Sequence, residues 1–197
     1  MSFAALDEGA LDQLFRQART AHAFRSDPIP PETIRRLFEL AQWGPTAFNA
    51  QPARFVGVTS AQGKALLLPC LSPGNVAQTQ AAPLTVIVAY DLQFHKHLPT
   101  LFPAYDAAPL YRNNPTLTEQ TAQRNSTLQG AYLLLAARAL GLDAGPMSGF
   151  DAARLDQSFF PQGHTRSNFL INLGVADRGL THPRGMRLSF EQTVQMV

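Results

Sequence analysis

Apolar residues recur at helical spacing in several segments of the chain. Spacings of three and four between Leu11, Leu14 and Ala18 predict a helix over residues 6–19. The same period predicts a second helix over residues 31–41, because proline at the first turn and an early acid favour a helix start. Further helices are predicted over residues 60–68, 73–78, 117–140 and 152–159.

Shorter apolar runs predict the strands. The run Leu84–Tyr90 is apolar at both alternating sets of positions, which is typical of a strand buried on both faces. Further strands are predicted over residues 54–59 and 168–175. Residues 91–115 are rich in proline, aromatic residues and asparagine, so we expect an irregular excursion of the kind that forms lids or specificity loops.

The length of 197 residues predicts one domain that extends over residues 1–197. No repeat or linker divides the sequence. Apolar residues make up 45% of the chain and charged residues 15%, whereas the usual charged fraction is about 25%. A chain so poor in charge is typical of a protein that hides part of its surface in an oligomer.

The charge and hydropathy of the sequence exclude several partners. The formal net charge is only +2 and no lysine and arginine cluster forms a basic stripe, so nucleic acid is not an expected partner. No apolar run approaches the roughly 18 residues of a membrane span, and the first residues do not resemble a signal peptide. The single Cys70 suits a reducing compartment, so we expect a soluble, cytoplasmic protein.

Several kinds of catalytic centre are not indicated. His95 and His97 are two positions apart and would not share a helical face, so no metal site is expected. The sequence contains neither the G-x-S-x-G nucleophile motif nor a glycine-rich phosphate loop. We interpret Cys70 as a packed small apolar residue, because no basic neighbour in sequence would activate its thiol. No residue is therefore assigned a catalytic role.

Two segments combine glycine and proline with small polar residues, and each follows a predicted helix. They are residues 43–52 and 141–151. Glycine and proline fix backbone conformations that neither a helix nor a strand would supply, and they let a flat ligand approach main-chain amides. We interpret both segments as walls of a ligand site, although loops that only connect elements carry some of the same residues.

Basic side chains occur in two places that could bind a phosphate. Arg19, His22 and Arg25 lie between the first two predicted helices, and Arg184 and Arg187 lie near the C-terminus. Arginine contacts phosphate oxygens through two parallel donors, so convergence of the two groups would make a monophosphate site. Solvated arginines on the surface are an equally good interpretation of the sequence.

These segments together resemble the FMN-dependent nitroreductase family over nearly the whole chain. The resemblance is carried by residues 19–24, 44–52 and 140–151, by Asn75 and by the late arginine. Within the family, the chain is most similar to the branch that contains malonic semialdehyde reductase, through residues 43–46, 101–103, 145–151 and 187–191.

The resemblance implies an α+β fold of three layers, α/β/α, with a largely antiparallel central sheet, and an intertwined homodimer with two interfacial FMN sites. Arg19, Thr20, Arg184 and Arg187 would hold the phosphate, and Asn75 would bind near the ribityl chain and pyrimidine edge. Pro45, Thr46 and Asn49 would come from the partner subunit, and Pro146, Met147, Ser148 and Gly149 would lie near flavin N5. The other positions assigned to the cofactor are His22, Arg25 and Gln78.

The sequence departs from the family pattern at three of these places. Ala21 and Ala23 stand where family members often have a serine and a basic residue, and the neutral Gln78 replaces a basic residue. A shift of the chain would bring Arg25 to the place of the missing cation. Without a cation near flavin N1, the reduced cofactor is less stabilised, and its reduction potential should fall.

The resemblance implies an oxidoreductase that passes hydride from NADH or NADPH through flavin N5 to an electron-poor small molecule, by a ping-pong mechanism. The acceptor would be a nitroaromatic, a quinone or a small aldehyde such as malonic semialdehyde, whose carboxylate would bind Arg112 or Arg25. The excursion should contact it through Phe102, Tyr105, Tyr111, Arg112 and Asn113. The alternative is a flavin-binding protein with a sensory, storage or interaction role and little turnover.

Overall fold

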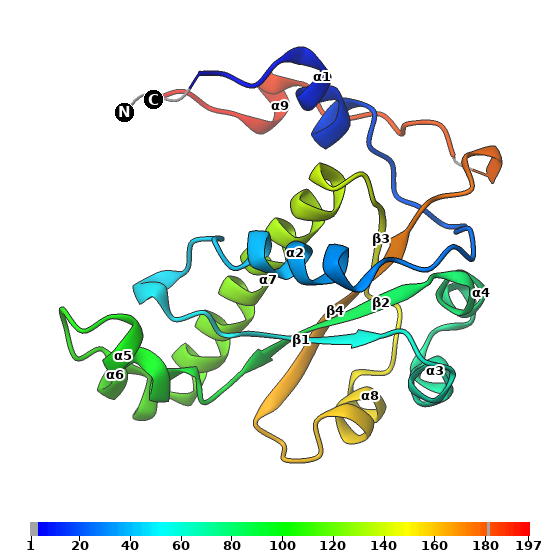
Figure 1. Cartoon of the computed structure of the whole chain (residues 1–197). Helices are drawn as coiled ribbons and strands as arrows, with labels where there is room; N and C mark the ends of the chain where they lie inside the picture. The colour runs from blue at the N-terminus through cyan, green and yellow to red at the C-terminus, as the bar shows by residue number, and fades with distance from the viewer. Residues whose placement is uncertain (1–3, 181) are drawn as a thin grey trace.

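A computed structural model of the chain describes residues 4–180 and 182–197. Its centre is a four-stranded antiparallel sheet in the order β1-β2-β4-β3 (Figure 1). The strands are β1 (Ala53–Val58), β2 (Leu84–Asp91), β3 (Asp143–Met147) and β4 (Thr165–Gly174). All residues of β2 are buried, which confirms the predicted central strand.

Helices connect the strands and cover the sheet. The α-helices are α1 (Glu8–Leu11), α2 (Pro31–Ala41), α3 (Ala61–Leu67), α4 (Pro73–Ala81), α5 (Leu98–Leu101), α6 (Ala108–Arg112), α7 (Pro115–Ala139), α8 (Ala152–Phe159) and α9 (Phe190–Thr193). The predicted starts of α3 and α4 are confirmed: the Ser60 hydroxyl accepts a hydrogen bond from Gly63 N, and Pro73 opens α4.

The helices form one layer on each face of the sheet. Val86 and Val88 of β2 belong to a core that includes residues of α2 and α7. The alternate residues Ile87 and Ala89 belong to a second core with residues of α3 and α8. Figure 1 shows α7 crossing one face of the sheet and α3, α4 and α8 lying at the other. The predicted three-layer α+β fold is therefore confirmed.

Three predicted elements differ from those observed. The segment 141–151 contains strand β3, although its glycine and proline argued against a strand. The excursion 91–115 contains helices α5 and α6 and a small core of its own, which includes Phe94 and Tyr111. The first helix is short: α1 continues into a π-type turn over Asp12–Arg16 and ends before residue 19.

Strand β3 is held from both sides. On one side it pairs with β4, and on the other side Ala21 N donates a hydrogen bond to Ala144 O at 3.0 Å. A Cβ atom on Gly145 would lie 2.3 Å from Ala21 O, so only glycine permits this approach of the two main chains. Gly145 therefore allows two main chains to pack directly against each other, so the segment after α1 lies beside the sheet.

One face of α7 remains exposed in the single chain. The sequence predicts burial of this helix on more than one face, but Leu128 is 44% and Tyr132 39% exposed. Trp43, on the loop after α2, is 77% exposed, and Phe190 in α9 is 61% exposed. Among the described helices, none is long and apolar enough to cross a membrane.

The substitution Gly145→Ala tests the close approach to Ala21. We expect the free energy of unfolding to fall by about 1–3 kcal/mol, because the new methyl group must displace the main chain of residue 21. Urea unfolding followed by circular dichroism measures this change. Gly74→Ala is the control, since a Cβ at Gly74 meets no atom within 4 Å. Equal losses in the two variants would show that the contact is not tight.

Candidate functional site

Four of the five residues in the two basic groups, all except Arg25, line one pocket of about 340 Å³, which we call the arginine pocket. Because these basic residues meet in one pocket, we interpret them as an anion site and not as separate solvated arginines on the surface. Its lining residues are Phe15, Ala18, Arg19, Thr20, His22, Arg138, His182, Pro183, Arg184, Gly185 and Arg187.

Main-chain carbonyls at the end of the first helical segment orient the two principal arginines. Arg184 Nη2 donates to Phe15 O at 3.0 Å and to Ala18 O at 2.9 Å. Arg19 Nη1 donates to Ala18 O at 3.0 Å. Among the hydrogen bonds of the described residues, each guanidinium uses one terminal nitrogen in this way. The other nitrogen of each remains for an anion.

The cations in the arginine pocket act on one another. Partial desolvation lowers the pKa of the Arg184 guanidinium, and the charges of Arg19, Arg187 and Arg138 lower it further. Like charges held together in this way repel, and a bound anion would relieve the repulsion. The electrostatics of the pocket therefore favour an anionic ligand.

A second group of predicted residues meets where α4 faces the end of β3. Asn75 Nδ2 donates to Gly149 O at 2.8 Å, and Gln78 Nε2 donates to Asn75 Oδ1 at 2.8 Å. A Cβ on Gly149 would lie 2.6 Å from Asn75 Nδ2. Pro146 and Ser148 are exposed, whereas Met147 and Gly149 are partly buried, so this segment presents two small side chains beside these amides.

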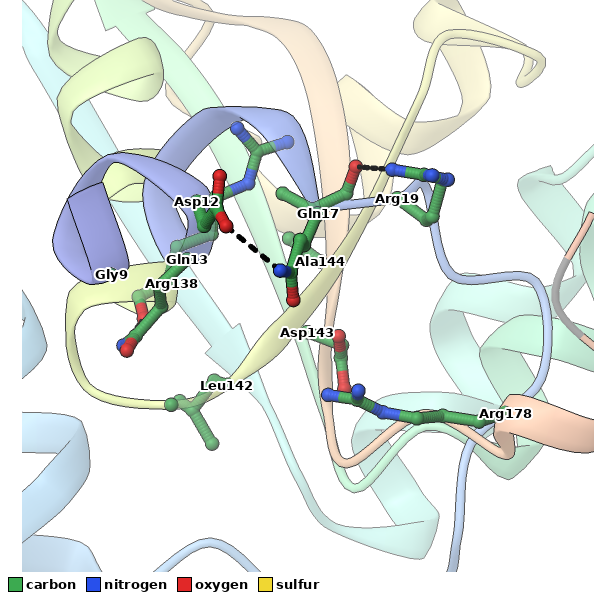
Figure 2. A pocket seen from close by; sticks show the side chains of 12 residues that line it. Gly9, Asp12, Gln13, Gln17, Arg19, Arg138, Leu142, Asp143, Ala144 and Arg178 are labelled. Carbon is green, nitrogen blue, oxygen red and sulfur yellow. Dashed lines mark hydrogen bonds between the residues drawn. The ribbon is translucent and has the colours of Figure 1, made fainter. Parts of the chain in front are cut away.

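The first two groups lie along one strand. Thr20 forms a parallel bridge with Ala144 at the start of β3, whereas Met147 ends that strand. Figure 2 shows the neighbouring cavity, of about 460 Å³, whose lining includes Arg19, Asp143 and Ala144. The arginine pocket thus lies beside the start of β3, and the amides of α4 lie beside its end.

A third group lies on the loop after α2. Phe48, Asn49 and Gln51 have φ values of 51°, 50° and 43°, a left-handed conformation that is unfavourable for residues other than glycine. Asn49 Nδ2 donates to Leu101 O at 3.1 Å, and Thr46 Oγ1 accepts from Gln51 N at 3.1 Å. Pro45, in the same loop, is exposed. The loop is held in this conformation by its neighbours.

The predicted acceptor residues pack against this loop. The ring centroid of Phe48 lies 5.3 Å from that of Phe102 and 6.2 Å from that of Tyr105. Arg112 and Asn113 are exposed, whereas Tyr111 is only 5% exposed and packs against Phe94 in the small core. Tyr111 therefore supports the excursion in this chain, because its ring is enclosed.

The third group does not meet the first two within one chain. In Figure 1, the loop between α2 and β1 lies with α5 and α6 at one end of the molecule, and α4 lies at the other. Arg25 is also not brought to the arginine pocket: its side chain is exposed, and its main-chain N donates to Val175 O at 2.9 Å. The predicted site is therefore incomplete in a single chain.

Sequence reasoning missed two residues that line the arginine pocket, Arg138 and His182. Arg138 Nη1 donates to Leu14 O at 2.9 Å, and burial lowers the pKa of its guanidinium. A sequence signal existed, because Arg138 is the single charged residue in the apolar run over residues 131–140. His182 packs edge-on against His22 with ring centroids 5.6 Å apart, and nothing in the sequence indicated that pair.

The chain is similar to known proteins over nearly its whole length. The model of the nitroreductase family matches residues 15–174. The chain therefore belongs to the nitroreductase family. A relative from Stenotrophomonas maltophilia, provisionally named NADH dehydrogenase/NAD(P)H nitroreductase, is 54% identical and covers 98% of both chains.

Solved structures confirm the nitroreductase fold. A provisionally named nitroreductase from Bacillus subtilis has a TM-score of 0.88 at 23% identity and covers 97% of this chain and 100% of its own. A nitroreductase of similarly provisional name from Exiguobacterium sibiricum, solved in complex with FMN, has a TM-score of 0.85 at 19% identity over 100% of both chains.

The substitution Phe48→Ala tests whether aromatic packing holds the loop after α2. We expect the free energy of unfolding to fall by about 1.5–3 kcal/mol, the value of burying a large apolar side chain. Hydrogen–deuterium exchange should also become faster over residues 47–51. Leu110→Ala in α6 serves as the control, since Leu110 is 44% exposed and is not among the residues of the small core. Unchanged exchange in the Phe48 variant would mean that the loop keeps its conformation without the ring.

Proposed function

We propose that this nitroreductase is an FMN-dependent oxidoreductase that uses NADH or NADPH to reduce a small electron-poor molecule. The convergence of Arg19 and Arg184, which lie far apart in the sequence, on one pocket beside the start of β3 is the observation that supports it most, and Asn75 lies beside the end of the same strand. The name of the Stenotrophomonas relative and the FMN complex of the Exiguobacterium protein agree with the proposal.

The residues beside β3 fit the parts of FMN. A phosphate matches the donors of Arg19, Arg184 and Arg187, and its charge would offset their mutual repulsion. The amides of Asn75 and Gln78 can both donate and accept, as the pyrimidine edge of a flavin requires. The small side chains of Pro146 and Ser148, and the lack of a side chain at Gly149, leave room for a flat ring.

Bound FMN would supply the redox chemistry, by accepting hydride from the nicotinamide and passing it to the acceptor. The chain would orient the ring and control what reaches it. Since donor and acceptor would use the same exposed surface beside Pro146 and Ser148 in turn, the cycle would be ping-pong and would need no protein nucleophile.

The side chains that we place beside the pyrimidine end of the flavin carry almost no charge. Ala21 and Ala23 carry no charge, and the amide of Gln78 is engaged by Asn75. Arg25 lies outside the arginine pocket and does not take the place of the missing cation within one chain. We therefore expect a low reduction potential for the bound cofactor.

We further propose that two chains form the site together, as an intertwined homodimer. The loop between α2 and β1, which carries Pro45, Thr46 and Asn49, lies away from α4 within one chain (Figure 1), so these residues could reach a flavin only in a second copy. The exposed stripe of α7 that includes Leu128 and Tyr132 offers an apolar surface for that copy. A stable interface of this kind buries about 2,000 Å² or more.

Malonic semialdehyde is the acceptor that we propose within this class. The exposed Arg112 stands beside the aromatic residues of the excursion and could bind a substrate carboxylate. Turnover decides between an enzyme and a flavin-binding protein with another role. An enzyme oxidises NADH or NADPH in an acceptor-dependent way, whereas a binding protein would hold FMN without turnover.

Removal of either principal arginine should weaken FMN binding. We expect Arg19→Ala and Arg184→Ala each to cost about 1.5–3 kcal/mol, the value of a charge-assisted hydrogen bond. Quenching of FMN fluorescence measures the affinity, and circular dichroism checks the fold. Arg25→Ala is the matched control and should bind as the wild type does. Wild-type affinity in both pocket variants would remove the proposed phosphate site.

A charge on the stripe of α7 should separate the two chains. Leu128→Glu places a carboxylate in the proposed interface, so we expect a monomer that no longer retains FMN. Light scattering and the flavin absorbance of the purified protein are the measurements. Leu66→Glu, at a residue of α3 that is 50% exposed, should remain a dimer with FMN. A monomer of Leu128→Glu that keeps its flavin would refute the shared site.

The role of Arg112 is tested by comparing two acceptors. Arg112→Ala should raise the KM for malonic semialdehyde and leave the KM for an uncharged quinone nearly unchanged. Only malonic semialdehyde has a carboxylate, and the substitution removes the partner of that carboxylate. Steady-state oxidation of the nicotinamide gives both values. Equal effects on the two acceptors would make Arg112 structural, and no effect on either would place it away from the acceptor.

A further inference from the structure

A chain of buried hydrogen bonds runs from the centre of the sheet to the end of β3. Thr85 Oγ1 donates to Asn172 Oδ1 at 2.7 Å, and Asn172 Nδ2 donates to Thr79 Oγ1 at 3.1 Å. Thr79 Oγ1 in turn contacts Met147 Sδ at 3.8 Å. Thr79, Thr85 and Asn172 are all 0% exposed. This series of hydrogen bonds and contacts therefore links strands β2, β4 and β3 to helix α4.

Thr79 occupies an unusual position in α4. Among the residues of this helix, all of which the structure describes, it is the single fully buried one. Aliphatic side chains that fit between neighbours normally fix how a helix lies on a sheet. In α4 that place is taken by a hydroxyl, so a directional hydrogen bond to Asn172 sets the helix relative to the strands.

The sheet register supports the same point. Asn172 lies opposite Thr85 on one side and opposite Gly145 on the other. It thus sits in the row of the sheet where Gly145 meets the segment after α1. An aliphatic residue would fill this interior position without the desolvation cost of burying an amide, a cost that rises when a hydrogen-bond partner is missing.

Helix α4 carries the two amides of the proposed site. Gln78 precedes Thr79 directly, and Asn75 lies one turn earlier. Gln78 Nε2 also lies 3.9 Å from Met147 Sδ, so the thioether contacts both the buried hydroxyl and the amide of the site. A shift of α4 along the sheet would move both amides relative to Gly149.

We infer that Thr79 and Asn172 are positioning residues for the cofactor site, and that they act by fixing α4 so that Asn75 and Gln78 face Met147 and Gly149. The inference rests on the proposed flavin site. Functional groups must be held within about 0.5 Å by supporting hydrogen bonds and packing, and a buried polar pair at the base of α4 supplies that support.

The test compares Thr79→Val with Thr79→Ser and with Ile87→Val. Valine keeps the shape of threonine and removes the hydroxyl, so we expect FMN to bind at least tenfold more weakly. Serine restores the hydroxyl and should restore affinity to within threefold. Ile87→Val is the control for stability, because Ile87 is 0% exposed in the core shared with Met147 and has no part in the hydrogen-bond chain. FMN fluorescence quenching gives the affinities, and thermal unfolding of the FMN-free protein gives the stabilities.

A second measurement makes the inference independent of the proposed function. In the FMN-free protein, the side-chain amide NMR signals of Asn75 and Gln78 should shift in Thr79→Val and stay in place in Ile87→Val. Wild-type protein that fails to bind FMN would refute the proposed function, and the amide signals would still test the role of Thr79. Unmoved signals in Thr79→Val, or equal loss of affinity in Ile87→Val at equal loss of stability, would overturn the inference.

Discussion

The arrangement of the candidate site along β3 depends on the close contact between the main chains of Ala21 and Gly145. Strand β3 would otherwise be an edge strand, and a glycine-rich edge has little side-chain packing to hold it. Because Gly145 has no Cβ, the segment after α1 lies directly against the strand and donates a hydrogen bond to Ala144 O. That contact carries Arg19 and Thr20 to the start of β3. It also leaves Pro146 and Ser148 exposed at the strand's far end.

The same geometry separates the parts of the proposed site within one chain. Carbonyls at the end of the first helical segment hold Arg184 beside Arg19, and α4 holds Asn75 against Gly149. The strained loop with Thr46 and Asn49 is fixed by the aromatic residues of the excursion, at the other end of the molecule. Exposed apolar residues on α7 and near the C-terminus accompany this separation. A second copy would cover that surface and complete the site in a single step.

Local patterns predicted the elements that depend on local interactions. Proline at the start of α2, the Ser60 cap of α3 and the apolar run of β2 each specify their element within a few residues. Strand β3 could not be predicted in this way, because the sequence Asp143–Met147 has low strand propensity and is extended through its pairing with β4.

The candidate site was predictable in its residues but not in its geometry. Motifs and resemblance named Arg19 and Arg184, yet their convergence depends on contacts between segments far apart in the sequence. For the same reason Arg138 and Thr79 were missed. Each lies in a helix, and the neighbouring residues in the sequence do not predict its contacts with distant segments. The burial of Tyr111 likewise follows from the fold of the excursion, which shows no period in the sequence.

The central claim is that each site takes residues from two chains, and mixed dimers test it most directly. One chain would carry Arg19→Ala with Arg184→Ala, and the other Thr46→Ala with Asn49→Ala, each with its own affinity tag. Each variant alone should purify without flavin. A dimer of the two should hold one FMN, because one of its two sites then combines an unaltered arginine pocket with an unaltered loop. A mixed dimer without flavin, when both variants are folded and paired, would contradict a shared site.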